Sequence, residues 1–162
     1  MSSQGAILAL ALCTAGGALV WGAMSDLRSY TIPNWVSATV ALAFIPAALV
    51  SSHFRPLDAL MGLGLGLGAG LVLFALRWMG GGDVKMFAAL SLWSGASGLL
   101  DLALTTSIAG AAVSIFMLSP LRRWAPSPPK AARDSAAHPV PYGAAIAAGG
   151  LWLLARYARF MD

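Results

Sequence analysis

Long apolar runs limit the folds open to this chain more than any other feature of its sequence. Of its 162 residues, 59% are hydrophobic and only 10% are charged, and the mean hydropathy is +0.77. Soluble domains usually carry about 25% charged residues, so a water-soluble globule of this size would have a surface too poor in charge. The composition therefore argues against a soluble enzyme and predicts an all-α membrane protein.

The apolar runs divide the chain into six predicted spans, since a helix needs about 20 apolar residues to cross a bilayer. The stretch Val84 to Leu118 would form a helix of about 52 Å, too long for one crossing, and Ser94–Gly98 offers a natural break. We expect a single domain, residues 1–162, folded as a six-helix bundle. The predicted spans are 5–24, 35–50, 57–76, 84–97, 99–118 and 140–155, with a basic, proline-rich loop at 119–139.

The basic residues predict the orientation of these spans, because cytoplasmic loops are enriched in Lys and Arg. The first four residues carry no basic side chain, whereas a cleaved signal peptide begins with positive charge. With the N-terminus outside, the inner loops would hold Arg28, Arg77, Lys85, Arg122, Arg123, Lys130 and Arg133, and the outer side Arg55, Arg156 and Arg159. The net charge of +4 is then explained by lipid headgroups rather than by nucleic acid.

Glycines in the third predicted span recur at Gly62, Gly66 and Gly70, with further glycines between them. The alternation resembles a strand, but an isolated strand cannot satisfy its backbone in lipid. In a helix, a spacing of four places the three glycines on one face, where a second helix can approach closely. We interpret this pattern as packing rather than chemistry.

Asp26 is the first candidate for chemistry, because ionisable groups near membrane depth are costly and are often functional. It ends the first span, just before a short segment that contains Arg28 and Ile32-Pro33-Asn34. Pro33 disfavours helix at the preceding residue and starts the second span, and Thr31 or Asn34 is expected to cap it. The short loop should hold Asp26 close to the second span.

Asp83 is the second candidate, in the run Gly80-Gly81-Gly82-Asp83-Val84-Lys85. Glycines such as Gly80 and Gly82 would leave room for a polypeptide substrate and permit unusual backbone angles. Asp83 falls at the start of the fourth span, where helix amides favour a carboxylate, and Lys85 adds positive charge nearby.

The two carboxylates are 57 residues apart, yet both fall at ends of spans on the same predicted side. If they meet, like charge prevents both from ionising, so that one is a base while the other keeps its proton. Such a pair can activate water against a peptide bond without a metal or cofactor. The alternative is that each Asp only caps a helix or pairs with Arg28 or Lys85.

These motifs resemble the type IV prepilin peptidase family of GxGD intramembrane aspartic proteases. The resemblance rests on Gly80-x-Gly82-Asp83 with Val84-Lys85, on Asp26-Leu27-Arg28 with Ile32-Pro33-Asn34, and on Pro139 to Ala147. It implies that Asp26 and Asp83 are the catalytic pair, with Gly80, Gly82, Lys85, Arg28, Pro33 and Asn34 binding substrate or shaping the site. It also implies a multi-pass protein of the bacterial inner membrane whose site faces the cytoplasm.

The resemblance further implies cleavage of prepilins, with the leader peptide and first transmembrane helix as the partner. Larger members carry an extra domain with paired Cys-x-x-Cys motifs and also methylate the new N-terminus. This chain has a single cysteine, Cys13, which excludes an internal disulfide and a Cys-rich metal site. It is more similar to the short peptidases dedicated to Flp or tight-adherence pili.

Two rival interpretations come from the residues. Gly95-Ala96-Ser97-Gly98 matches the GxSG of rhomboid serine proteases, but a serine nucleophile needs a histidine base, and His53 and His138 both fall in predicted loops. A transporter of protons or cations, or a pilus-assembly scaffold, could also use the Asp pair. A transport path should place polar groups in mid-span, and here the middles of the spans are almost purely apolar.

Overall fold

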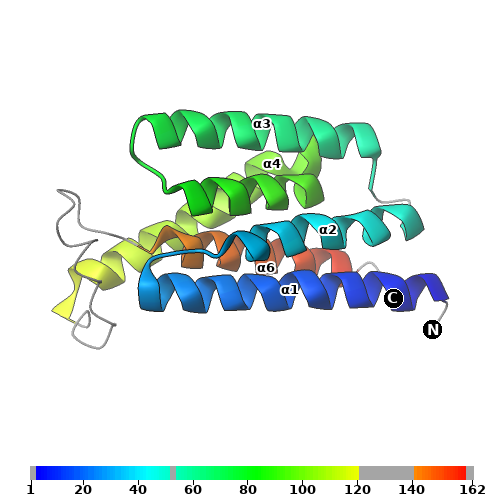
Figure 1. Cartoon of the computed structure of the whole chain (residues 1–162), viewed down its shortest axis with the longest axis horizontal. Helices are drawn as coiled ribbons and strands as arrows, with labels where there is room; N and C mark the ends of the chain where they lie inside the picture. Colours follow the sequence, from blue (N-terminus) through cyan, green and yellow to red (C-terminus); the bar gives the residue numbers. More distant parts are fainter. Residues whose placement is uncertain (1–2, 52–53, 121–140, 160–162) are drawn as a thin grey trace.

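Five helices make up the regular structure of the described residues. The computed structural model describes residues 3–51, 54–120 and 141–159, and every regular element of four or more residues in these ranges is an α-helix. The helices are α1 (Ser3–Ser29), α2 (Asn34–Val50), α3 (Pro56–Ala75), α4 (Gly81–Leu118) and α6 (Tyr142–Ala158). They lie side by side along the long axis of the molecule (Figure 1). The predicted all-α class is confirmed.

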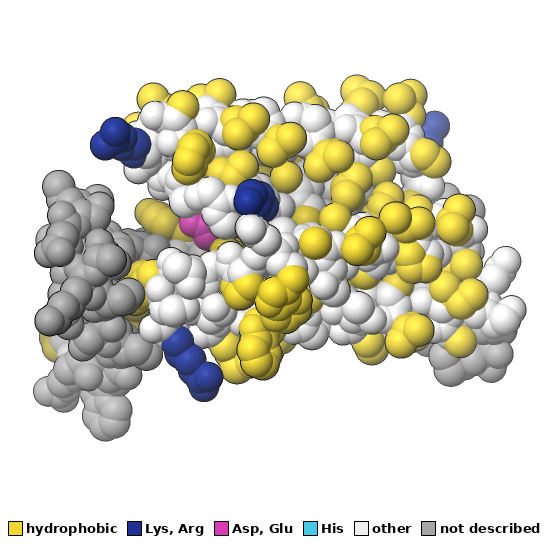
Figure 2. Space-filling model, viewed as in Figure 1, with side chains coloured by type: hydrophobic (Ala, Val, Ile, Leu, Met, Phe, Trp, Pro, Cys, Tyr) yellow, Lys and Arg dark blue, Asp and Glu magenta, His cyan; other side chains and the backbone are white. Residues whose placement is uncertain are grey.

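The helices α1, α3 and α4 are long and apolar enough to cross a membrane, and α2 is a shorter apolar helix of 17 residues. Large apolar side chains also cover the outside of the molecule (Figure 2). Leu49 is 81% exposed and Leu118 is 87% exposed, which suits lipid rather than water as the surrounding solvent. These features support a membrane protein.

The expected division into six separate spanning helices is not found in the described residues. The fourth and fifth predicted spans are joined in α4, a 38-residue element that is interrupted only at Gly95, where φ is 64° and ψ is 177°. This conformation suits glycine, because side chains disfavour positive φ. The interruption falls inside the predicted break, but a single residue makes the turn, without a loop. The halves before and after it run in opposite directions (Figure 1).

The bundle has two distinct ends. At the turn end, α1 turns into α2, α3 turns into α4, and α6 begins (Figure 1). At the terminal end lie the start of α1, the end of α6, the start of α3 and the interruption of α4 (Figure 1). Asp26 and Asp83 belong to the turn end, because they lie near the end of α1 and the start of α4.

The glycines of α3 make the close helix contact that the sequence predicts, and the partner is the first half of α4. Gly62, Gly66 and Gly70 are buried. A Cβ at Gly62 would meet the backbone of Ser91 and Gly95, one at Gly66 would meet the Ser91 side chain, and one at Gly70 would meet Val84. Gly64 and Gly68 are exposed, and nothing lies within 4 Å of a Cβ built there. The spacing of four, not the alternation, therefore describes the contact.

Two other expectations concern the cap of α2 and the proline-rich loop. Neither Thr31 nor Asn34 caps α2, because Pro33 occupies the N-cap position and no side chain bonds to the first turn. Pro33 itself has φ −61° and extended ψ, so its ring sets the direction in which α2 starts. The predicted proline-rich loop lies almost wholly outside the described residues, since the structure does not describe 121–140.

Candidate active site

Asp26 lies in the last turns of α1 and is only 5% exposed. Its carboxylate Oδ2 accepts a hydrogen bond of 3.2 Å from the backbone amide of Ala144 in the first turn of α6. The amides of a first helical turn have no partner within the helix and favour a negative charge. The α6 backbone comes this close because residue 143 is glycine: a Cβ there would lie 2.9 Å from Asp26 Cγ.

Asp83 is the third residue of α4 and is half-buried. Its Oδ2 accepts a 3.2 Å hydrogen bond from the amide of Gly80, the residue that precedes the helix. The carboxylate thus folds back over its own helix start, a common capping arrangement. A Cβ at Gly80 would lie 3.0 Å from that carboxylate oxygen, so glycine permits this close return.

The two carboxylates are near enough to interact electrostatically. They come from different helices, and neither accepts a hydrogen bond from Arg28 or Lys85 within the described part of the chain. On the face shown in Figure 2, acidic side-chain atoms are visible in a recess near the turn end. Two interacting carboxylates that no described Lys or Arg neutralises form the arrangement that acid–base chemistry on a water molecule requires.

Of the other predicted site residues, Lys85, Asn34 and Gly82 contact other parts of the protein. Lys85 Nζ donates to Asn34 Oδ1 at 2.9 Å, which joins α4 to the start of α2. A Cβ at Gly82 would lie 3.2 Å from Ile32 Cβ, so the space beside Gly82 is filled by the protein, although the sequence suggested room for a peptide. Arg28 is exposed on the last turn of α1.

Three residues at the site carried no predicted role. Ile32 lies against Gly82, which precedes Asp83, and against Gly143 of α6. Gly143 and Ala144 approach Asp26 from α6. Their positions were contained in the segments that resemble the peptidase family. A backbone amide that binds a carboxylate leaves no mark on residue type, so the sequence by itself offered no signal for Ala144.

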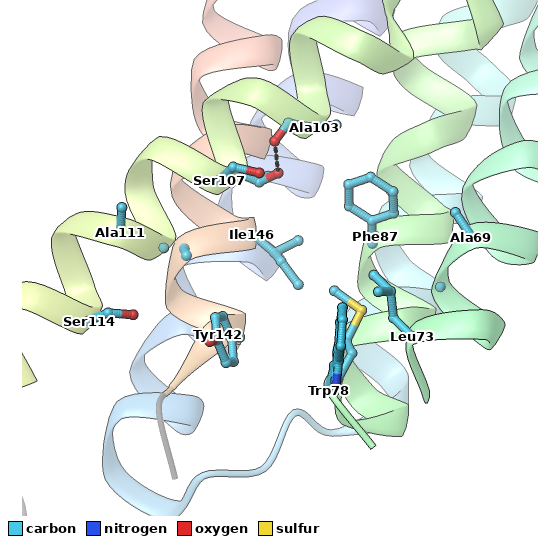
Figure 3. Close-up of a pocket in the computed structure, with 15 residues that line it drawn as sticks. Ala69, Leu73, Trp78, Phe87, Ala103, Ser107, Ala111, Ser114, Tyr142 and Ile146 are labelled. Atoms are coloured by element: carbon cyan, nitrogen blue, oxygen red, sulfur yellow. Dashed lines mark hydrogen bonds between the residues drawn. The ribbon is translucent and has the colours of Figure 1, made fainter. Parts of the chain in front are cut away.

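An apolar groove of about 570 Å³ is lined by residues of α3, α4 and α6, together with Trp78 and Met79 from the segment that joins α3 to α4. Figure 3 shows Leu73, Trp78 and Phe87 on one side of it, with Tyr142 and Ile146 facing them. Small residues of the second half of α4 line a further wall, namely Ala103, Thr106, Ser107, Gly110, Ala111 and Ser114. The groove is therefore bounded by α3 and the first half of α4 on one side and by the second half of α4 and α6 on the other.

The walls of this groove lead directly into the segments that bind the carboxylates. Met79 lines the groove and precedes Gly80, whose amide binds Asp83. Tyr142 lines it from α6 and lies two residues before Ala144, whose amide binds Asp26. An extended apolar segment lying in the groove would thus end next to the pair.

Ser97, the candidate of the rhomboid interpretation, has an acidic partner rather than a basic one. Its hydroxyl donates to Asp58 Oδ2 at 2.8 Å, and its amide donates to Asp58 Oδ1 at 3.2 Å. Both bonds lie at the terminal end. His53 and His138 lie outside the described residues. Among the described residues, no group of three or more His, Cys, Asp or Glu side chains could hold a metal ion.

Fold and site together define a helical membrane protein with a pair of interacting carboxylates at one end of the bundle. Residues 13–115 match the type IV leader peptidase family. The match covers more than half of the chain and includes both Asp26 and Asp83, so the protein belongs to this family. No curated protein and no solved structure matches the chain.

Proposed function

We propose that this chain is a membrane-embedded aspartic endopeptidase that removes the leader peptide of prepilins, with Asp26 and Asp83 as its catalytic pair. Membership of the leader peptidase family supports protease activity. The observation that carries the assignment of residues is that these two carboxylates, from α1 and α4, lie at one end of the bundle near enough to interact, and that no described Lys or Arg forms a hydrogen bond with either.

The proposed chemistry needs only the pair and one water molecule. The ionised carboxylate takes a proton from water as the water oxygen attacks the peptide carbonyl carbon, and the protonated carboxyl donates a hydrogen bond to the carbonyl oxygen. Collapse of the tetrahedral intermediate breaks the C–N bond, and a proton passes to the leaving nitrogen. The amides of Gly80 and Ala144 hold the two carboxylates in place during these steps.

We further infer that the apolar groove beside the pair receives the first transmembrane helix of the prepilin. Its walls are mostly apolar or small, and it lies between membrane-spanning helices. The scissile bond would then lie at the turn end, which we place at the cytoplasmic face of a bacterial inner membrane. All six helical segments, counting the two halves of α4, would cross the bilayer, and Flp-like prepilins are the proposed substrates.

Co-expression with a candidate prepilin tests this function. The wild-type chain should yield a shortened product on a gel, and Asp26→Asn and Asp83→Asn should each reduce cleavage at least about 10³-fold at equal protein levels. The double variant should lose little more, because residues that act as one unit are not additive.

Asp101→Asn is the matched control, since Asp101 forms an exposed ion pair with Arg156 at the terminal end and should not affect processing. Normal processing by either catalytic variant would contradict the assigned pair. An uncut prepilin with wild-type enzyme would favour a transporter or an assembly scaffold.

A further inference from the structure

Ile32 lies among the backbones of three helices. A Cβ at Gly82 on α4 would lie 3.2 Å from Ile32 Cβ, and one at Gly143 on α6 would lie 2.5 Å from Ile32 Cδ1. On α1, a Cβ at Gly22 would lie 3.9 Å from Ile32 Cγ2. Glycine at positions 82 and 143 allows α4 and α6 to pack directly against this one side chain, and at position 22 the contact of α1 with it is an ordinary van der Waals one.

Each of these glycines adjoins a part of the carboxylate pair. Gly82 immediately precedes Asp83, and Gly22 lies four residues before Asp26, on the same face of α1. Gly143 precedes the amide that binds Asp26. Ile32 therefore touches the backbone next to both carboxylates, and its size sets how far apart those backbones lie.

A second contact holds the Ile32 segment to α4 from outside. Asn34 follows Ile32 after one proline, and its Oδ1 accepts the 2.9 Å hydrogen bond from Lys85 Nζ. Pro33 fixes φ at −61° between these two residues, so the fastening at Asn34 also limits the motion of Ile32. Lys85 is two residues beyond Asp83. The contact of Ile32 with Gly82 and the hydrogen bond of Asn34 with Lys85 therefore both lie close to Asp83.

We propose that Ile32 is a positioning residue that sets the separation of Asp26 and Asp83, and that the Asn34–Lys85 hydrogen bond fastens it in place. This inference rests on the proposed function. Catalysis by a carboxylate pair depends on geometry, and a displacement of about 1 Å can cost about 10²-fold in rate. Lys85 then acts on the reaction through Asn34 rather than by binding the substrate.

Stepwise shortening of the Ile32 side chain tests whether its size sets the separation of Asp26 and Asp83. Ile32→Val removes Cδ1, the atom that faces Gly143, and Ile32→Ala also removes the Cγ atoms. With full-length protein in detergent and a prepilin that retains its leader and first transmembrane helix, kcat should fall stepwise. We expect a loss of roughly 10- to 100-fold for Ile32→Ala, with KM within about twofold. Ile45, which is 52% exposed on α2, supplies the matched control, and Ile45→Ala should leave both constants unchanged.

The role of the Asn34–Lys85 hydrogen bond is tested by removing its donor and then by restoring one. Lys85→Met should lower kcat in the same way, whereas Lys85→Arg, which can still donate to Asn34, should recover most of it. Asn34→Ala combined with Lys85→Met should cost no more than either change alone. A raised KM with unchanged kcat would overturn the positioning role and indicate substrate binding. A wild-type chain that leaves the prepilin uncut would instead refute the proposed function, on which the inference rests.

Discussion

Trp93 and Ser97 are four residues apart in α4, and a backbone group of each forms a hydrogen bond with a different helix. The amide of Ser97 donates to Asp58 on α3 at 3.2 Å, and the carbonyl of Trp93 accepts from the Tyr157 hydroxyl of α6 at 2.6 Å. An uninterrupted helix would pair these two groups with each other. Because lipid offers no replacement partners, the sharp turn at Gly95 is stable only with such substitutes.

Tyr157→Phe should destabilise the bundle, because it leaves the carbonyl of Trp93 without a donor. Trp93 is 1% exposed, and an unsatisfied buried acceptor costs about 1 to 3 kcal/mol. The thermal midpoint in detergent micelles should fall accordingly. Tyr30→Phe is the control, since the Tyr30 hydroxyl makes no hydrogen bond among the described residues. Equal midpoints for the two variants would show that the Tyr157 bond contributes nothing.

Gly95→Ala should be more damaging than Gly98→Ala, although both change a glycine of the same Gly-Ala-Ser-Gly segment. A Cβ at Gly95 would collide with the Asp58 carboxylate and would be held at φ 64°, a conformation that costs a side-chain residue of order 1 kcal/mol or more. A Cβ at Gly98 would make an ordinary 3.5 Å contact with Ser94 Cβ. Yield of folded protein and thermal midpoint both measure the difference, and similar losses would contradict the turn geometry.

The sequence predicts those features that depend on residue type and spacing. Apolar runs predict the helices, the spacing of Gly62 and Gly66 predicts a close contact with a second helix, and Ser94–Gly98 predicts the region of the turn. The two Asp motifs place both carboxylates at one end because helices alternate in direction.

Features that depend on the backbone could not be predicted in this way. The amide of Ala144 binds Asp26 only because α6 passes α1 closely at Gly143. Likewise, the run around Gly82 suggested space for substrate, since a sequence does not show what fills the place of a missing side chain. In the structure, Ile32 fills that place.

Two classes of glycine in α3 should respond oppositely to alanine. A Cβ at Gly62 would lie 2.5 Å from the backbone of Ser91 and Gly95, so Gly62→Ala must push α3 away from α4 and lower the thermal midpoint. Gly64 has nothing within 4 Å of a built Cβ, and Gly64→Ala should be neutral or should stabilise by about 0.5 to 1 kcal/mol through reduced backbone entropy. Destabilisation by Gly64→Ala, or tolerance of Gly62→Ala, would contradict the α3–α4 interface.

The orientation of the bundle can be measured with single cysteines in a Cys13→Ser background. Thr31 lies exposed at the turn end and Leu57, 72% exposed, lies at the terminal end. If basic residues such as Arg28 and Lys85 keep the turn end in the cytoplasm, a membrane-impermeant maleimide added to intact bacterial cells should label Leu57→Cys. Thr31→Cys should react only after the membrane is permeabilised. The reverse pattern would place Asp26 and Asp83 on the outer face, where a cytoplasmic leader peptide could not reach them.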